Sequence, residues 1–167
     1  MRLRHAALLV LAALVVGAVV GGRLGVGVGA GRSPGDRDGA RIERVVDGDT
    51  VVISGLGKAR LIGIDTPEVF GGTECFGREA SAYAKALLPA GTPVRYRLGT
   101  EPRDRYGRAL VYLFLRDGRH VNELLARNGY AQPLTIAPNV EYAQRFRALS
   151  REARRAGRGL WSACAHQ

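Results

Sequence analysis

The chain has 167 residues and a formal net charge of +10, with 46% hydrophobic and 24% charged residues. This length argues against several domains, and residues 40–167 have the mixed composition of one globular domain. A chain this basic attracts polyanions such as nucleic acid or anionic membranes, although a solubilising surface is an equally simple explanation of the charge.

The N-terminal segment, residues 1–30, combines two early arginines with an uncharged apolar run from Ala6 to Gly22. This order is typical of a secretory signal, and the run is just long enough for a membrane span. We therefore expect a cleaved signal, with a retained N-terminal anchor as the alternative. The rest of the chain is then secreted, or held on the outer side of the cytoplasmic membrane. Residues 31–39 predict a flexible linker.

The folded domain is expected over residues 40–163, with residues 164–167 as a tail, and its first part predicts three strands. Alternating apolar and β-branched residues with intervening turn signals predict strands at 40–46, 50–54 and 58–64, which form a meander. The segment Asp65–Phe76 contains a proline and two glycines and predicts a loop.

The second part alternates helices and strands. Apolar spacing predicts a helix at 77–88, a short helix beginning near Val121 and ending before Gly129, and a last helix capped by Asn139 and running to about Ala156. Strands are expected at 92–98 and 108–115, with polar residues 100–107 between them and an irregular stretch at 130–138. Val140 is expected to face inward.

Five strands with a helix after the third predict an α+β, mainly β fold, a five-stranded OB-fold barrel with three helices. Small barrels of this kind often bind oligonucleotides across one face, but the fold alone does not establish a function.

The two cysteines, Cys75 and Cys164, both lie in the part expected outside the cytoplasm. An even pair in an oxidising compartment predicts one disulfide, with two free thiols as the alternative. Closing so long a loop contributes ~4–5 kcal/mol in the chain-entropy model.

The first motif is the Asp47-Gly48-Asp49 turn. Asp-Gly between apolar residues is explained by a hairpin alone. The second aspartate is unnecessary for the turn, whereas it would supply an oxygen ligand for a hard cation at the strand's edge.

The second motif runs from Arg60 to Glu68. It places an arginine on a predicted strand, Asp65 just beyond the strand, and Pro67 in a turn that presents the glutamate. An ordinary strand end with an Asx-turn accounts for the aspartate and proline. It accounts less well for the arginine and the glutamate. The third motif, Asp104–Arg108, is by itself explained by a polar hairpin loop.

Together, the order and spacing of these motifs resemble the staphylococcal nuclease family, from about Arg41 to Trp161. The resemblance also includes Gly77–Ala82, Val121-Asn122-Glu123 and Gly159-Leu160-Trp161.

The resemblance implies a role for each motif residue. Asp49 and Asp65 would bind Ca²⁺ with the backbone carbonyl of Thr66, and Asp47 would lie behind these ligands. Glu68 would stand beside the attacking water as general base or water-orienting group, while Arg60 and Arg108 would contact the scissile phosphate. Arg105 and Tyr106 would contact substrate.

These residue types also suit phosphodiester hydrolysis on general chemical grounds. A hard cation with carboxylate ligands bridges phosphate and water, and arginine offers bidentate contacts to phosphate oxygens. No histidine is needed, and His120 is expected on the surface.

The resemblance implies an endonuclease that hydrolyses DNA and RNA without sugar preference and leaves 3′-phosphates; a monomer is the default. The competing interpretation is an OB-fold module that binds nucleic acid without cutting it. A binding module has no need for two aspartates, a glutamate and two arginines at these spacings, so the enzyme is favoured.

One departure concerns the nucleotide pocket, where the family has two tyrosines before the last helix. Residues 132–138 contain no aromatic residue, and stacking is worth ~1–3 kcal/mol per base elsewhere. Tyr130 and Tyr142 are the nearby candidates to replace them.

Overall fold

The structure is a computed structural model that describes residues 39–164. The predicted signal or anchor at 1–30, the linker up to residue 38 and the last three residues of the tail lie outside this range. No helix within the described range is long and apolar enough to cross a membrane.

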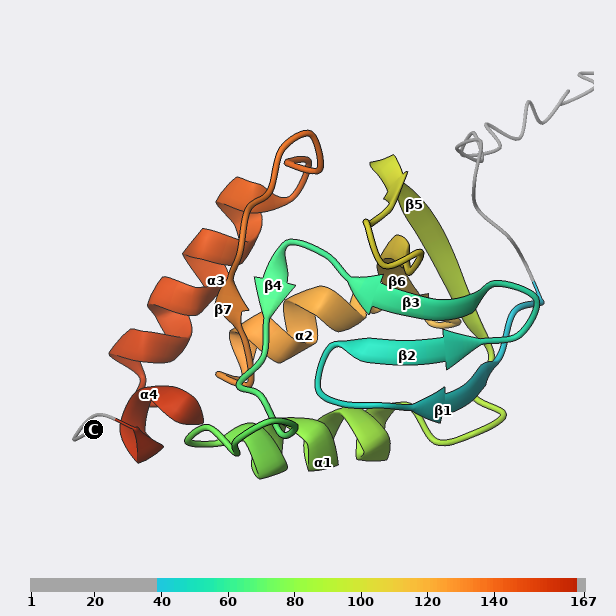
Figure 1. Cartoon of the computed structure of the whole chain (residues 1–167). Helices are drawn as coiled ribbons and strands as arrows, with labels where there is room; N and C mark the ends of the chain where they lie inside the picture. The colour runs from blue at the N-terminus through green and yellow to red at the C-terminus, as the bar shows by residue number, and fades with distance from the viewer. Residues whose placement is uncertain (1–38, 165–167) are drawn as a thin grey trace, which may run out of the picture. The chain divides into compact units, whose positions relative to one another are not determined.

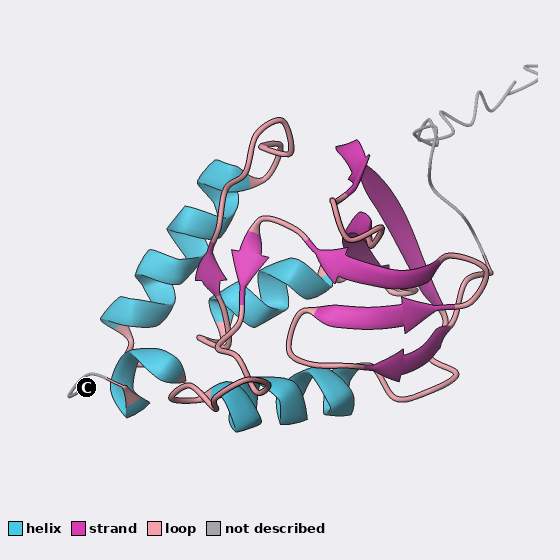
Figure 2. Cartoon of the chain, in the orientation of Figure 1, coloured by secondary structure: helices cyan, strands magenta, loops and turns pink. Residues whose placement is uncertain are grey.

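A five-stranded sheet forms the centre of the domain (Figures 1 and 2). Its first three strands are the predicted antiparallel meander, and the third pairs in parallel with the last strand in sequence. In spatial order the strands are β1 (Ile42–Val45), β2 (Thr50–Ile53), β3 (Gly57–Leu61), β6 (Ala109–Leu115) and β5 (Val94–Arg103).

The two edges of this sheet meet at the beginning of β1 and β5. Arg41 and Pro93 form an isolated bridge. The Ile42 N–H donates to the Thr92 carbonyl at 2.9 Å, and the Val94 N–H donates to the Ala40 carbonyl at 2.9 Å. The sheet therefore curls into an OB-like arrangement without forming a formally closed barrel, and the predicted α+β class is confirmed.

Helices pack along part of the sheet (Figure 1). The three predicted helices are present, and a short fourth helix follows them: α1 (Gly77–Leu87), α2 (Val121–Arg127), α3 (Ala143–Arg155) and α4 (Leu160–Ala163). Helix α1 packs beside β1, α2 packs against β6, and α3 covers α2.

A second, two-stranded sheet pairs β4 (Ile64–Asp65) with β7 (Gln132–Pro133). The segment 130–138 is thus not wholly irregular. Its strand is short and its partner lies far away in sequence, so no local pattern could reveal it.

Asn139 does not cap the last helix, contrary to the sequence interpretation. Helix α3 begins at Ala143, while the buried Asn139 side chain accepts from the Glu101 N–H at 2.9 Å and donates to the Glu101 carbonyl at 3.0 Å. This contact supports β5 as far as Arg103, so half of the predicted polar connection is strand. Val140 is 50% exposed instead of facing inward.

His120 is buried, so its expected surface position is wrong. Its ring stacks on Phe114 at 4.5 Å and meets Tyr142 edge-on. Burial lowers the pKa of His120 to about 4, although Glu123 acts in the opposite direction. The histidine is therefore a neutral part of the packing.

Asn122 connects three parts of the fold from a fully buried position. Its side-chain oxygen accepts from the Leu113 N–H at 3.0 Å, and its amide donates to the Ile62 carbonyl at 2.9 Å. These bonds fix α2 to β6 and to the chain that leads from β3 into β4, where Asp65 lies.

The predicted disulfide joins Cys75 to Cys164 across 89 residues, and neither described cysteine is free. It fastens the loop before α1 to the end of α4.

Replacing both cysteines by alanine should lower the free energy of unfolding by about 2–5 kcal/mol, because the unfolded chain then loses its loop constraint. Urea unfolding measures the difference. A reductant should destabilise the native chain by a similar amount and leave the double variant unchanged; equal stability of the two chains would contradict the prediction.

Candidate active site

Asp49 lies in the turn between β1 and β2 and is 6% exposed. Its Oδ2 accepts from the Thr66 N–H at 3.0 Å and from the Thr66 hydroxyl at 3.1 Å, and the carboxylate is ion-paired with Arg60. Burial raises the pKa of Asp49, while Arg60 and the Thr66 hydrogen bonds act to lower it. The turn is thereby joined to the end of β4.

Asp47 and Gly48 explain how this turn is shaped. Asp47 Oδ1 accepts from the backbone N–H groups of Asp49 at 3.1 Å and Thr50 at 2.7 Å, a local side-chain bond typical of turns. A Cβ at Gly48 would lie 2.5 Å from the Thr66 hydroxyl oxygen. Only glycine therefore allows the turn to lie directly against Thr66.

Arg60 projects from β3, where it is paired with Thr50 of β2. Its side chain is 14% exposed and contacts both predicted metal-binding carboxylates, Asp49 and, at 2.6 Å, Asp65. The predicted cluster of Arg60 with the two aspartates and Thr66 is thus brought together, with the guanidinium between the carboxylates.

Glu68 lies in the loop after β4, with an exposed side chain. Burial and the negative charges of Asp49, Asp47 and Asp65 all raise the pKa of Glu68. The glutamate therefore belongs to the same electrostatic cluster as the two aspartates that flank Arg60.

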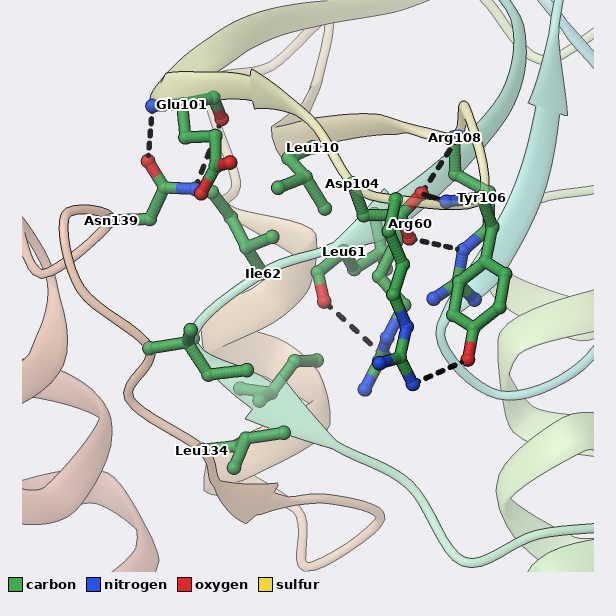
Figure 3. A pocket seen from close by; sticks show the side chains of 14 residues that line it. Arg60, Leu61, Ile62, Glu101, Asp104, Tyr106, Arg108, Leu110, Leu134 and Asn139 are labelled. Atoms are coloured by element: carbon green, nitrogen blue, oxygen red, sulfur yellow. Dashed lines mark hydrogen bonds and ion pairs between the residues drawn. The ribbon is translucent and has the colours of Figure 1, made fainter.

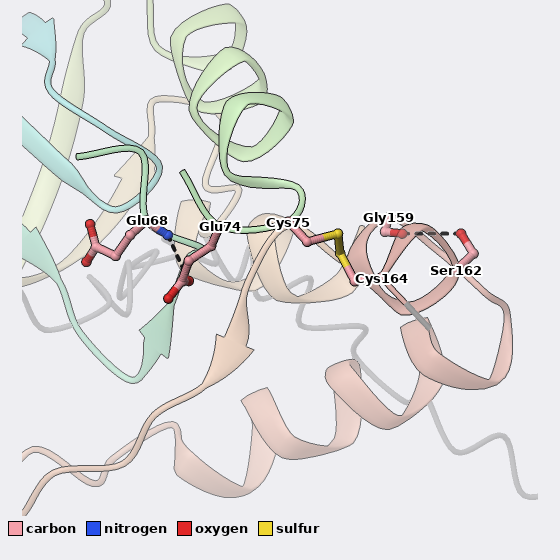
Figure 4. The surroundings of a disulfide bond; sticks show 6 residues. All are labelled: Glu68, Glu74, Cys75, Gly159, Ser162 and Cys164. Atoms are coloured by element: carbon pink, nitrogen blue, oxygen red, sulfur yellow. Dashed lines mark hydrogen bonds between the residues drawn. A yellow bond between two sulfur atoms is a disulfide. The ribbon is translucent and has the colours of Figure 1, made fainter. Parts of the chain in front are cut away.

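The backbone of Glu68 is held by its neighbours in the loop (Figure 4). Its N–H donates to Glu74 Oε2 at 3.0 Å, and its carbonyl accepts from the Glu74 N–H at 2.9 Å. Cys75, next in sequence, carries the disulfide. A Cβ at Gly77 would lie 2.4 Å from the Glu68 carbonyl oxygen, so the start of α1 can press on this loop only because residue 77 is glycine.

Arg108 lies immediately before β6 and is held by Asp104 (Figure 3). Asp104 Oδ2 accepts from Arg108 Nε at 2.7 Å, and Oδ1 accepts from the Arg108 and Tyr106 N–H groups at 2.9 and 3.0 Å. The Tyr106 ring is 68% exposed and lies against the guanidinium groups of Arg105 and Arg108, at 4.8 and 5.6 Å.

A cavity of about 440 Å³ brings Arg60 and Arg108 together on one wall (Figure 3). The other side is largely aliphatic, with Leu110, Leu134 and Ile136. The two predicted phosphate-binding arginines therefore face one space that also has room for an apolar group.

Neither Tyr130 nor Tyr142 lines this cavity. Tyr130 stacks on Tyr83 at 4.0 Å, and Tyr142 packs on Tyr112 at 4.7 Å. Both are used in packing, so they do not replace the aromatic residues absent from 132–138.

The oxygen groups around Arg60 have the chemistry that a hard cation requires. The guanidinium of Arg60 contacts the carboxylates of Asp49 and Asp65, and the negative charges of Asp49, Asp47 and Asp65 contribute to the raised pKa of Glu68. No set of three or more His, Cys, Asp or Glu side chains within residues 39–164 is gathered to hold a metal unaided. A cation here would therefore need backbone or water oxygens beside Asp49 and Asp65.

Two residues that fix the position of other site residues were not predicted from the sequence. Asp104 was assigned to a polar loop, although its position four residues before Arg108 is a visible signal. Glu74 carries no such signal, because its contact with Glu68 depends on how the loop folds back.

The family model "Staphylococcal nuclease homologue" matches residues 58–163. The chain is 34% identical to a thermonuclease of Staphylococcus hyicus over 80% of this chain and 81% of that protein. It is 35% identical to a thermonuclease of Staphylococcus intermedius over 72% and 74% of the two chains. It is also 34% identical to the endonuclease YhcR of Bacillus subtilis (strain 168), over 72% of this chain but only 11% of that much longer protein.

The Asp104–Arg108 pair predicts a pH-dependent contribution to stability. Burial acts to raise the pKa of Asp104, but the hydrogen bonds and charge of Arg108 outweigh it and hold this pKa below its ordinary value of 3.8. Such a carboxylate stabilises the fold above that value, and the contribution is lost as the pH falls through the folded pKa.

Asp104→Asn should therefore lower the free energy of unfolding by about 1 kcal/mol at neutral pH, and by progressively less below pH 3.8. Urea titrations of both proteins across this range measure the effect. A deficit that is independent of pH would show that the charge of Asp104 does not act as described.

Proposed function

Because the chain belongs to the staphylococcal nuclease family and is a nuclease, we propose that it is a Ca²⁺-dependent endonuclease that hydrolyses DNA and RNA to 3′-phosphate products. The observation that carries this proposal is the position of Arg60. It contacts both Asp49 and Asp65 and lines the same cavity as Arg108. Carboxylates that can bind a cation and arginines that can bind a phosphate are therefore adjacent.

Asp49, Asp65 and the carbonyl of Thr66 would hold the ion, with Asp47 behind them, because Asp47 fixes the turn that carries Asp49. When bound, Ca²⁺ would supply Lewis-acid polarisation of the phosphate and of the attacking water.

Arg60 and Arg108 would bind and orient the phosphate. Their guanidinium groups can donate two hydrogen bonds each to phosphate oxygens, and these bonds strengthen as the oxygens gain negative charge in the transition state. Arg108 is pre-oriented by Asp104. Arg60 lies between the buried Asp49 and the exposed Asp65 and also lines the cavity, so its guanidinium can turn from Asp65 to a phosphate.

Glu68 would orient the attacking water or accept its proton. Its raised pKa makes its carboxylate a better proton acceptor than an ordinary glutamate, and general bases function best with a pKa near the working pH. The contacts from Glu74 and Gly77 would keep the backbone of Glu68 in place during this step.

Substrate contacts beyond the phosphate would come from Arg105 and Tyr106 and from the aliphatic side of the cavity. Leu134 and Ile136 can contact a nucleobase by apolar packing, but they supply no aromatic stacking. Weak selection among bases, and activity on both sugars, are therefore part of the proposal.

The proposal also places the nuclease outside the cytoplasm, as a monomer, secreted or anchored through its N-terminal segment. The Cys75–Cys164 bond supports this placement, because structural disulfides persist in oxidising compartments. Its substrates would be extracellular DNA and RNA.

Single-stranded DNA should be degraded with added Ca²⁺ and left intact when EGTA removes the ion, because the phosphate and the attacking water would then lack the Lewis acid that polarises them. Release of acid-soluble nucleotide is the measurement, and restoration by excess Ca²⁺ is the control. Cutting that persists in EGTA, or DNA binding without cutting at any Ca²⁺ concentration, would refute the mechanism; the second result would favour a binding module.

Arg108→Ala should lower kcat by about 10²–10³-fold, the usual cost of removing one preorganised donor from a transition state. Asp104→Asn is the matched control, since it removes the same ion pair but keeps the guanidinium. It should lose much less activity than Arg108→Ala, because the guanidinium is still present and only its orientation by Asp104 is weakened. If both variants lost activity equally, Arg108 would act through loop structure and not through the phosphate.

A further inference from the structure

A second cavity, of about 400 Å³, lies between the loop after Glu68 and helix α1. It is formed by the loop after Glu68 and by one face of α1, and it shares no lining residue with the cavity that contains Arg60 and Arg108. Val46 and Val69 line it, and these residues are the immediate sequence neighbours of Asp47 and Glu68. The cavity is therefore next to the proposed centre of hydrolysis.

Phe70 lines this cavity and is a large aromatic residue with 63% of its surface exposed. Among the large hydrophobic side chains within residues 39–164, it is one of few so open to solvent. An aromatic ring presented in this way gives little to the core, whereas it offers a flat face to a planar ligand.

Two basic residues of α1 stand beside this ring. Arg78 and Lys85 both line the cavity and are exposed. They are seven residues apart, which places them on one face of the helix and about 10 Å apart along its axis. Neither makes an ion pair with another residue of the part that the structure describes, so their charges are available to a ligand.

An exposed aromatic ring next to unpaired cations is the combination that binds single-stranded nucleic acid: the base stacks and the cations follow the phosphates. Purely apolar partners would leave Arg78 and Lys85 uncompensated, and a simple anion would leave Phe70 unused. The two features together select a nucleotide.

We propose that Phe70, Arg78 and Lys85 form a second nucleotide subsite, which binds the substrate strand between the loop after Glu68 and helix α1, separately from the cavity that Arg108 lines. This inference rests on the proposed nuclease function and extends it, because it implies a preference for unpaired strands long enough to cover both cavities. It also supplies an aromatic contact that segment 132–138 lacks.

Oligothymidylates of increasing length test the subsite through kcat/KM. Phe70→Ala should lower kcat/KM for an oligomer of about eight residues roughly tenfold, mainly through KM, and leave the shortest cleavable oligomer nearly unchanged. Phe70→Trp should restore the native value, because stacking is retained. An equal loss at every length, or no loss at any, would overturn the proposal.

The charges are tested by salt dependence. Arg78→Ala and Lys85→Ala should each reduce the slope of log kcat/KM against log salt concentration by about 0.7 for the longer oligomer. Arg151→Ala removes one equally exposed charge from α3 and should leave the slope unchanged. If all three variants changed the slope equally, only the net charge of the protein would matter and the proposed subsite would be refuted.

Binding of the fluorescein-labelled octamer in EGTA separates the two proposals. If the protein binds the octamer in a Phe70-dependent manner but never cuts DNA, the subsite is supported and the proposed function is refuted. If the protein cuts DNA and Phe70→Ala leaves both binding and kcat/KM unchanged, the proposed function is supported and the subsite is refuted.

Discussion

The buried carboxylate of Asp49 is the interaction on which the rest of the site depends. A charge at 6% exposure is costly unless it is paired and hydrogen-bonded, and here Thr66 and Arg60 provide both. Satisfying this one group fixes the β1–β2 turn, the middle of β3 and the end of β4 relative to one another. The position of Asp65 and the direction of the loop towards Glu68 follow from that arrangement.

Much of this could be predicted because the informative patterns are local. Strand alternation and turn glycines predicted the meander, and the apolar spacing of α1 and α2 predicted these helices to within a residue or two. The site residues of the first two motifs all lie between Asp47 and Glu68, in the turn before β2, on β3 and β4, and in the loop that follows β4. What escaped prediction is non-local. Asn139 resembles a helix cap in sequence, but its side-chain amide forms hydrogen bonds with the backbone of Glu101 instead. His120 becomes buried because Phe114 and Tyr142 converge on it from different elements.

Arg60 shows how one side chain serves two states of the site. Within the fold described here it neutralises Asp49 and Asp65 and so offsets the cost of placing these charges together. The same guanidinium lines the cavity that Arg108 also faces. Arg60 therefore contributes both to the stability of the site without ligands and to the phosphate binding proposed above. A change that tightens its contacts with the aspartates is expected to weaken phosphate binding, a trade-off that is common at functional sites.

The disulfide divides the chain into a covalent ring, from Cys75 to Cys164, and a linear segment that precedes it. Arg108 belongs to the ring, whereas Asp49, Arg60, Asp65 and Glu68 belong to the linear segment. A protease that cuts one peptide bond of the ring, for example in the exposed Arg105–Gly107 turn, leaves every residue attached to the molecule. A single cut between Glu68 and Cys75 instead separates the carboxylates from Arg108. The loop that carries Phe70 is therefore the point at which one nick dismantles the site.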